Sequence, residues 1–524
     1  MIAVKNLLVD FDLMDLYTNR NKRITLNKVS ASQLNFLLMV NPKTKQYNIN
    51  EFVASIQSLL PKQAPKKPQK APPAFIIEDI VLNNCTFTLH DPLKDSVQLG
   101  QFDPSHFKIN DIFGRATNLR VFRDTVELDV KKIHGIEKSI DFPIENITTY
   151  FRYCNRSMSF LGVDARFGNS VLKDTVIFEY DTPTDMSSNF MGKVQIEAHL
   201  DSTILQIKDL AVFAPTIKNI NEILSASGNI KGTVEQLRSS NIQLDFGKNT
   251  SLRGKFALNG LPDIQNTFVE LDFEQSHISV KDFETYLSPK DFEYISGFGQ
   301  IDFEGDFLGF LNDFVTRGTF LTNFGKIKTD LNLKLKSKSY QGKIALTDFE
   351  LGDWLGTNLI GKIQMNGEIK GKGFKQKEAD FELDAQISSL NVNKYHYQNI
   401  NTDGRFKNQF FTGKLNINDP NLVIRSNGDL NLKDSTFAFK AHIDTVNIME
   451  LGYSKKPAFL KTYINADFRG LDIDQANGAV HMNDTYFSHN GNAIDLEYLS
   501  VFFDDDQDDR RAINVYSELV DIET

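Results

Sequence analysis

The sequence contains few of the residues and segments that mark disulfide-rich or membrane-spanning proteins. Cysteine occurs only twice in 524 residues, at Cys85 and Cys154, so one disulfide or none can form. We expect both thiols to be free and structural. The longest apolar runs, such as residues 34–40, fall far short of the ~18 residues that a membrane-spanning helix needs. The opening MIAVKNLLVDFDLMDL also lacks the charged, apolar and cleavage regions of a secretory signal.

Signatures of catalysis are missing as well. The chain contains no HExxH, CxxC, GxSxG or GxxxxGK[ST] motif. Its nine histidines are scattered, and His90 beside Asp91 has no nucleophile nearby in the sequence. We therefore predict that the chain is not an enzyme, has no catalytic residues and uses no cofactor.

One acidic segment near the end of the chain imitates a calcium-binding loop. Asp504, Asp506 and Asp508 have the spacing of the first three ligands of such a loop. Asp509 stands where the loop needs glycine, however, and Val515 stands where it needs glutamate. We interpret the segment as a solvated loop with at most weak, adventitious Ca²⁺ binding, and we predict no metal site.

The charge and composition indicate a folded protein that does not bind nucleic acid. The formal net charge is −10, and no basic stripe of the kind that contacts phosphate backbones is visible. Apolar residues make up 41% of the chain and include 42 phenylalanines but one tryptophan, which excludes a disordered chain. Phenylalanine must therefore supply much of the apolar packing.

Apolar side chains alternate with polar ones along much of the chain, and residues 421–452 show this most clearly. Leu422, Ile424, Leu430 and Leu432 occupy even positions, and after residues 433–435 the phase changes to odd positions. The odd set is Phe437, Phe439, Ala441 and Ile443. A period of two predicts strands, and the change of phase predicts a hairpin with one apolar and one solvated face.

The same alternation recurs in other segments and predicts a mainly β, antiparallel fold with a few short helices. These further candidates for one continuous apolar face are Ile242, Leu244, Phe246, Val269, Leu271, Phe273, Leu331, Leu333, Leu335, Phe381, Leu383 and Ile387. Such a face must be covered by a second sheet, by closure into a barrel, or by curving around a guest. The alternation does not choose among these three.

Changes in composition suggest a division of the chain. Residues 1–60 form a first module that ends in a short amphipathic helix behind Asn50, which we expect to pack on the sheet. Residues 61–73, PKQAPKKPQKAPP, are predicted to be an extended linker or exposed loop. Residues 74–213 continue the sheet, and residues 214–524 form loosely spaced repeats that start near 214, 282, 348 and 446.

The repeats carry a resemblance to a known family. Each copy joins an apolar connector to a short strand that ends in glycine, as in APTIKNINEILSASGNIKG and DFELGDWLGTNLIGKIQMNGEIKG, and alternating strands follow. This pattern is similar to that of the AsmA-like and TamB family. The opening VKNLLVDFDLMDLYTNRNKRITLNKVSASQLNFLLMV and the strand IEDIVLNNCTFTLHD resemble the family's first module.

The resemblance implies a long β-sheet curled into an open apolar groove, which contacts phospholipid acyl chains. It also implies a location in the periplasm of a diderm bacterium. Members of the family are anchored in the inner membrane and serve phospholipid traffic between the membranes or the assembly of outer-membrane proteins, which would make an outer-membrane assembly barrel a partner. Because the family's N-terminal transmembrane helix and C-terminal domain are absent from this sequence, we expect an internal portion of a larger protein. The alternative is a structural or adhesive β-repeat with a closed core and no lipid ligand.

Overall fold

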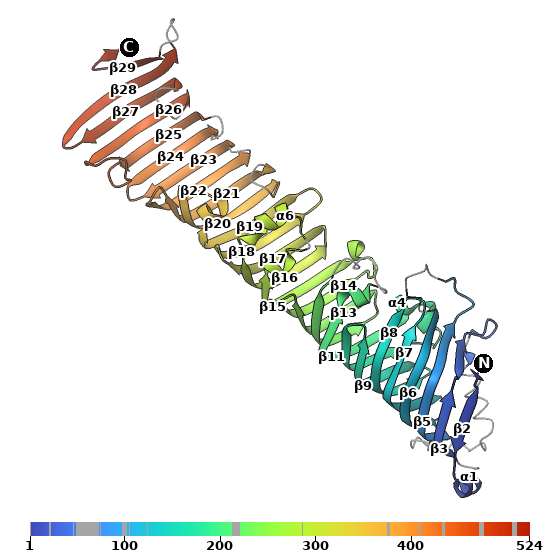
Figure 1. Cartoon of the computed structure of the whole chain (residues 1–524). Coiled ribbons are helices and arrows are strands. Elements are labelled where there is room, and N and C mark those ends of the chain that lie inside the picture. The colour runs from blue at the N-terminus through green and yellow to red at the C-terminus, as the bar shows by residue number, and fades with distance from the viewer. Residues whose placement is uncertain are drawn as a thin grey trace, which may run out of the picture. The chain divides into compact units, whose positions relative to one another are not determined.

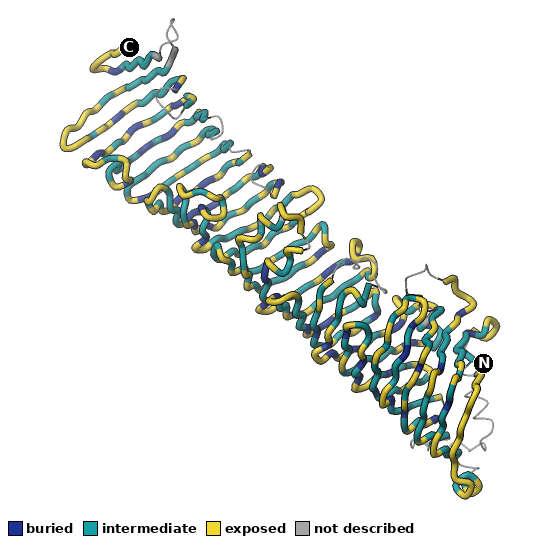
Figure 2. The backbone as a smooth tube through the Cα atoms, viewed as in Figure 1, coloured by how far each residue is buried: buried dark blue, intermediate teal, exposed yellow. Residues whose placement is uncertain are grey.

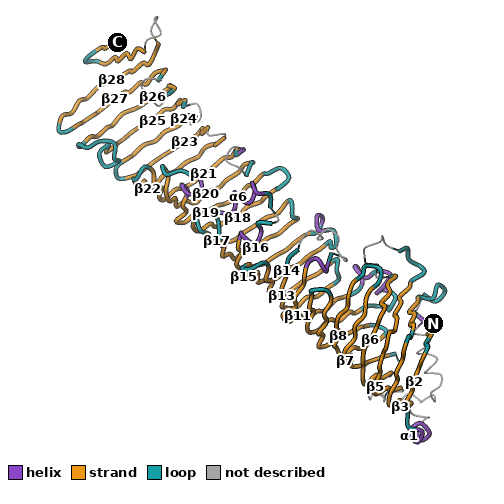
Figure 3. Tube along the Cα trace, viewed as in Figure 1, coloured by secondary structure: helices purple, strands orange, loops and turns teal. Residues whose placement is uncertain are grey.

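The computed structural model confirms the predicted mainly β fold, with an open, curved sheet and a few short helices (Figures 1 and 3). The residues that it describes are 2–19, 23–45, 47–48, 73, 75–96, 102–103, 105–122, 124–211, 221–285, 287–374, 378–407, 410–431, 435–470, 476–505 and 511–523. They divide into two compact units, Met1–Ser288 and Pro289–Thr524, which we call unit 1 and unit 2.

Unit 1 is a sheet built around the long strand β5. Its strands are β1 (Ile2–Ala3), β2 (Asn6–Asp10), β3 (Ile24–Ser32), β4 (Asn35–Met39), β5 (Phe75–His90), β6 (His106–Phe122), β7 (Thr125–Glu137), β8 (Phe142–Cys154), β9 (Ser157–Phe167), β10 (Ser170–Glu179), β11 (Gln195–Gln206), β12 (Ile223–Gly232), β13 (Gln236–Phe246), β14 (Thr250–Asn259) and β15 (Phe268–Ser279). Its helices are α1 (Leu13–Asn19), α3 (Asp185–Ser188), α4 (Phe190–Lys193), α5 (Ile207–Leu210), η2 (Ile264–Asn266) and η3 (Val280–Phe283).

Strand pairing in unit 1 follows the chain except at its beginning. From β5 to β15, each strand pairs antiparallel with the next. On the other side of β5, β3 and β4 pair with it one after the other and run parallel to it. The strands β2 and β1 then pair with β3 and β4. The sequence did not predict these parallel pairs, because alternation specifies a face and not a strand direction.

Unit 2 is a meander in which each strand pairs antiparallel with the next. Its strands are β16 (Gln300–Phe310), β17 (Asp313–Thr322), β18 (Gly325–Lys334), β19 (Ser339–Glu350), β20 (Ile360–Lys372), β21 (Asp380–Val392), β22 (Tyr395–Lys407), β23 (Phe410–Asp419), β24 (Leu422–Asn431), β25 (Thr436–Asn447), β26 (Ala458–Arg469), β27 (Asn477–His489), β28 (Asn492–Asp505), β29 (Arg511–Ser517) and β30 (Asp521–Ile522). Its helices are α6 (Pro289–Ser296) and α7 (Leu351–Leu355).

The alternating sequence produces two unlike faces in unit 2. Along β18, Ile327, Leu331 and Leu333 are half-buried on one face, whereas Lys326 and Lys328 are exposed on the other. Figure 2 shows the same alternation of half-buried and exposed residues along neighbouring strands. The predicted hairpin is also confirmed: β24 and β25 pair antiparallel, with Leu430 opposite Phe437. The two faces are called the apolar face and the polar face below.

The two ends of the strands in unit 2 carry different connections. One edge of the sheet, which we call the helical rim, contains α7 and the turns at 323–324, 393–394, 420–421 and 448–457. The opposite edge, which we call the aromatic rim, contains residues 311–312 and 335–338 and the ends of β20, β22 and β26. The predicted repeats that start near 348 and 446 both begin with a connection on the helical rim.

Three predictions cannot be compared with the structure. The helix behind Asn50 and the loop 61–73, apart from Pro73, lie outside the described residues, as does Leu432. The boundaries of the predicted domains do not coincide with the division into units 1 and 2, and they stay predictions.

Glycines on the apolar face allow neighbouring strands to approach closely. Gly413 and Gly428 are paired across β23 and β24, and their φ angles of 154° and 159° belong to a region that L side chains rarely adopt. A Cβ at Gly428 would lie 2.4 Å from the Phe439 Cα and 2.4 Å from the Ala438 carbonyl oxygen. Only glycine fits at this position, because any side chain would push β24 away from β25.

We predict that Gly428→Ala weakens the pairing of β24 with β25. The free energy of local opening should fall by about 2–4 kcal/mol, from backbone strain and the clash together. Hydrogen exchange of the β24 and β25 amides in the full chain measures this. Gly491→Ala is the matched control, because Gly491 also has a positive φ, 87°, but no atom within 4 Å of the added Cβ. Equal losses in the two variants would contradict the role of the close approach.

Candidate functional site

The candidate site is the apolar face, on which the strand register gathers most of the residues predicted from the sequence. In unit 2, two rows of side chains cross the sheet from strand to strand. The row nearest the aromatic rim, called the aromatic row, is Phe314, Leu333, Tyr340, Gly371, Phe381, Phe406, Phe411, Leu430, Phe437, Phe468, Gly478 and Phe503. The row nearer the helical rim, called the aliphatic row, is Phe320, Ile327, Leu346, Met365, Ile387, Ile400, Ile417, Ile424 and Ile443.

Other predicted residues lie on the same face of unit 2, outside these two rows. Leu331 and Phe439 lie opposite glycines, Gly342 and Gly428, and Leu383 lies opposite Gly404. Leu422 lies near the helical rim, opposite Asp419. All four apolar side chains are half-buried.

Unit 1 has an equivalent apolar face at β13–β15. Ile242 lies opposite Gly254, which in turn lies opposite Phe273, so all three belong to one face. Leu244 and Phe246 follow Ile242 on β13, and Val269 and Leu271 precede Phe273 on β15. Ile242 and Val269 are buried, and the others are half-buried.

The prediction for Leu335 is wrong. Strand β18 ends at Lys334, and Leu335 lies in the following turn with 42% of its surface exposed. The chain reverses there through Lys338, whose φ is +53°. Alternation no longer determines which way a side chain points once the strand has ended.

The two rows of unit 2 differ in burial. Four members of the aliphatic row, Met365, Ile387, Ile400 and Ile443, are between 4% and 9% exposed, and the other five are half-buried. Every member of the aromatic row is half-buried. The aromatic row therefore keeps apolar surface that other parts of the described protein do not cover.

Residues of the helical rim cover the middle of the aliphatic row, at Met365, Ile387 and Ile400. Phe349, at the end of β19, is 4% exposed and packs in one cluster with Ile363, Met365 and Ile387, and Leu351 of α7 packs against this cluster. The rings of Phe349 and Trp354 meet edge to face, with their centroids 6.2 Å apart. The connection β19–β20 is therefore folded onto the apolar face.

A hydrogen-bonded network fixes the next part of the helical rim. The carboxylate of Asp419 is 2% exposed and accepts hydrogen bonds from the Tyr395 hydroxyl at 2.5 Å and the Gln398 backbone N–H at 2.9 Å. The Asn421 amide donates to the Tyr395 oxygen at 3.0 Å. Burial, together with the nearby Tyr453 hydroxyl, raises the pKa of Tyr397 to about 12, so this tyrosine stays neutral. The network holds the connection 448–457 near β22.

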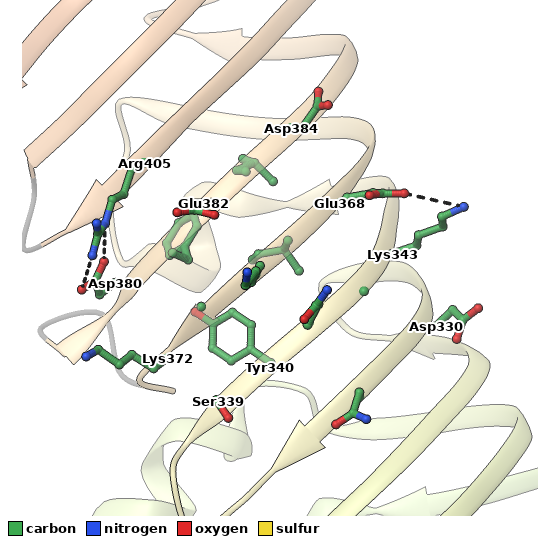
Figure 4. A pocket seen from close by; sticks show the side chains of 18 of the residues that line it. Asp330, Ser339, Tyr340, Lys343, Glu368, Lys372, Asp380, Glu382, Asp384 and Arg405 are labelled. Atoms are coloured by element: carbon green, nitrogen blue, oxygen red, sulfur yellow. Dashed lines mark hydrogen bonds and ion pairs between the residues drawn. The ribbon is translucent and has the colours of Figure 1, made fainter.

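Charged pairs occupy the aromatic rim. Lys334 pairs with Asp313 at 3.2 Å and Lys338 pairs with Glu378 at 2.8 Å. Asp380 accepts two hydrogen bonds from Arg405, at 2.8 and 2.9 Å, as Figure 4 shows. Lys407 lies 3.6 Å from the same carboxylate. These pairs tie together strands β17–β22 at the edge of the sheet.

One hollow lies mostly on the polar face of β18–β22. It has a volume of about 1080 Å³, and its lining mixes acidic and basic side chains such as Glu368, Lys372, Glu382 and Asp384 (Figure 4). Glu368 forms an ion pair with Lys343 at 3.7 Å. This mixture of charges is the ordinary solvated side of the sheet, so we do not assign a ligand to it.

A membrane-spanning helix or a metal site would indicate another functional class. No described helix is long and apolar enough to cross a membrane. The described residues contain no group of three or more histidine, cysteine or acidic side chains that could hold a metal ion. Asp506, Asp508 and Asp509 of the imitation calcium loop lie outside the described residues. Both cysteines are free, as predicted, with Cys85 buried.

One histidine–carboxylate pair was not predicted from the sequence. The His106 Nδ1 lies 3.1 Å from the Asp103 carboxylate, and its Nε2 lies 2.8 Å from the Asp91 carbonyl oxygen. Asp103 also accepts from the backbone N–H groups of Ser105 and His106. These bonds close the connection between β5 and β6, which is a structural role.

Comparison with known proteins does not add a family to these observations. No protein-family model, no curated protein and no solved structure matches the chain. The candidate site therefore rests on the geometry of the apolar face alone.

We predict that Asp380→Asn destabilises the protein at neutral pH and has no effect in acid. Hydrogen bonds from Arg405 hold the pKa of Asp380 below its usual value. A carboxyl group whose folded-state pKa is lowered stabilises fully above its unfolded pKa, ~3.9, and loses this contribution as the pH falls through the folded pKa. Melting temperatures measured from pH 7 downward should show the difference from wild type shrinking to nothing. A difference that persists in strong acid would contradict this assignment.

Proposed function

We propose that the chain carries phospholipid by holding acyl chains on its apolar face. The observation that supports this most is the aromatic row, which runs from β17 to β28 and remains half-buried along its whole length. The sheet is open and curved, so this face can be reached from outside without unfolding. A continuous apolar strip that is reachable but narrow suits a flexible hydrocarbon chain.

The energetics of such a site favour binding from water and allow release to a membrane. An acyl chain of ~16 carbons gains about 0.8 kcal/mol for each methylene it buries, or on the order of 10 kcal/mol in all. A bilayer offers a comparable gain, so transfer between the face and a membrane is close to balanced. A protein with this face therefore lowers the cost of moving lipid through water without trapping it.

The resemblance to the AsmA-like and TamB family supplies the proposed setting. In this proposal the chain is part of an inner-membrane-anchored protein in the periplasm of a diderm bacterium, and it carries phospholipid between the inner and outer membranes. The same resemblance makes an outer-membrane assembly barrel a candidate partner.

The competing function is a structural or adhesive repeat with a closed apolar core. Such a repeat needs a protein partner over the aromatic row, and within unit 2 the described residues leave that row half-buried. The cluster beside α7 shows what closed packing looks like in this chain: Met365, Ile387 and Ile400 of the aliphatic row are less than 10% exposed there. The contrast between this cluster and the half-buried aromatic row favours the lipid-carrying function.

We predict that Phe439→Asp abolishes lipid binding while the protein stays folded. The carboxylate would lie where an acyl chain passes and would cost a bound lipid several kcal/mol, but it could remain hydrated when no lipid is present. The measurements are lipid mass spectrometry of the purified full chain, photo-cross-linking of lipid at Phe437, and a thermal melt.

The matched control is Asn427→Asp, which makes the same charge change on the polar face. Asn427 is exposed and lies opposite Lys414 and Lys440 on the strands to either side. It should leave lipid binding unchanged. If Phe439→Asp unfolds the sheet and no position on the apolar face of wild type captures lipid, the closed-repeat function replaces the lipid-carrying one.

A further inference from the structure

The N-terminal end of unit 1 exposes apolar side chains to an unusual degree. Among the described residues, the three most exposed large apolar side chains lie here: Leu8 is 74% exposed, Met14 is 72% exposed and Leu13 is 71% exposed. Leu7 and Leu8 point to opposite faces of β2, and Figure 2 shows this strand exposed along its length. Exposed apolar surface of this extent marks a site of interaction with a protein or a membrane.

Helix α1 turns its apolar side away from the protein. Leu13, Met14 and Tyr17 fall on one face because of the helical period, and Tyr17 is 67% exposed. Asp15 and Asn19, on the opposite side, are half-buried, and α1 contacts β3. An amphipathic helix on the surface of a globular protein normally points its apolar stripe at the core. The orientation of α1 is the reverse.

Polar contacts hold α1 in this orientation. The Asp12 carboxylate caps the helix by accepting a hydrogen bond from the Met14 backbone N–H at 2.7 Å. The Asn19 side chain donates to the Asp15 carboxylate at 2.6 Å, and Arg23 lies 3.8 Å from the same carboxylate. The polar side of α1 therefore faces the chain that continues into β3, and the apolar side remains in contact with solvent.

The edge of unit 1 that carries α1 is rich in positive charge. It is the edge at which β3 and β5 begin and β6 ends, since Ile24 lies opposite Phe75 and Phe75 lies opposite Val121. The connections at this edge are residues 11–23, 123–124, 155–156 and 180–194, together with 61–74, the segment that leads into β5. They contain ten basic residues against five acidic ones, namely Arg20, Lys22, Arg23, Lys62, Lys66, Lys67, Lys70, Arg123, Arg156 and Lys193 against Asp12, Asp15, Asp124, Asp181 and Asp185.

The opposite edge of unit 1 has no such excess. Its connections contain six basic and seven acidic residues and are 40–60, 91–105, 138–141, 168–169 and 207–222. The chain as a whole carries a formal net charge of −10. The edge with α1 is therefore the part of unit 1 that an anionic surface attracts, and this attraction orients the protein with α1 toward such a surface.

We propose that the α1 end of unit 1 docks on a membrane whose surface carries anionic phospholipids. Leu13, Met14 and Tyr17 enter the headgroup region, and the positive charge of this edge attracts the lipid phosphates. A short apolar face or a modest positive charge alone binds a membrane weakly, whereas the two together give firm but reversible attachment. This surface lies outside the apolar rows of unit 2, so docking does not depend on the lipid-carrying function. It adds to that function a place where lipid is collected or delivered.

The experiment mixes the full chain with vesicles of phosphatidylcholine alone, or of equal parts phosphatidylcholine and phosphatidylglycerol, and floats the vesicles through a density gradient. Wild type should float with the mixed vesicles and stay unbound with phosphatidylcholine alone. Added salt should weaken this binding, because it screens the attraction between the basic edge and the phosphates. The variant L13S/M14S should lower the binding constant for mixed vesicles by about tenfold or more, because two apolar side chains no longer enter the bilayer.

The matched control is L359S/L519S, which removes two leucines that are 67% and 64% exposed elsewhere in the chain. It should float as wild type does. Both variants should keep the wild-type melting temperature, because all four side chains are exposed.

Three results would overturn the docking proposal: no flotation of wild type, equal losses in the two variants, or equal binding of wild type to both kinds of vesicle. A lowered melting temperature of L13S/M14S would overturn it as well, since the chain itself would then cover α1. If wild type self-associates in light scattering without binding vesicles, and L13S/M14S abolishes this, the surface belongs to a second copy. Lipid mass spectrometry of L13S/M14S tests the lipid-carrying function separately, and bound lipid there leaves that function standing.

Discussion

The structure depends on one constraint: each strand must place its apolar side chains on the same face as those of its neighbours. A shift of one residue in the pairing would turn a whole strand over and put its apolar set in water. In unit 2 the register carries the aliphatic row from Phe320 to Ile443 through consecutive strands without a break. Where a bulge interrupts the pairing, as between Ile443 and Val446, the apolar residues return to the same face.

The apolar face is large because the strands follow one another as a meander and do not fold back into a second layer. A sheet of this kind has to cover its apolar side with something other than a partner sheet. The chain covers part of its apolar face itself, with α7 and Phe349 at the helical rim. The aromatic row remains half-buried, and it is this uncovered part of the face that we propose binds lipid.

Glycine makes the crowded parts of the face possible. Gly404, Gly413 and Gly428 lie side by side on three successive strands. The Phe411 ring occupies the space that a side chain at Gly404 would need, and the backbone of Phe439 occupies that space at Gly428. The same glycines lower the stability of isolated strands, so the sheet depends on its cross-strand pairs.

The sequence by itself determined the class of fold and the membership of the apolar face. Alternation is a local property, and it identified β24 and β25, their hairpin and most of the predicted residues on the apolar face of each unit. It failed at Leu335, because the strand ended one residue earlier than the pattern. The sequence contains one further signal. Phe406 and Phe411 lie at equal distances from the turn between β22 and β23, and this spacing predicts that they face each other across the hairpin.

Only the tertiary structure decided which of these residues lie beside one another and which are covered. Rows such as Tyr340, Gly371 and Phe381 come from three strands, and the lengths of the turns between those strands set their register. The packing of α7 on the middle of the aliphatic row, and the parallel pairs of β3 and β4 with β5, join segments that no local pattern connects. Burial depends on what lies above a side chain, and a period of two in the sequence records only which way that side chain points.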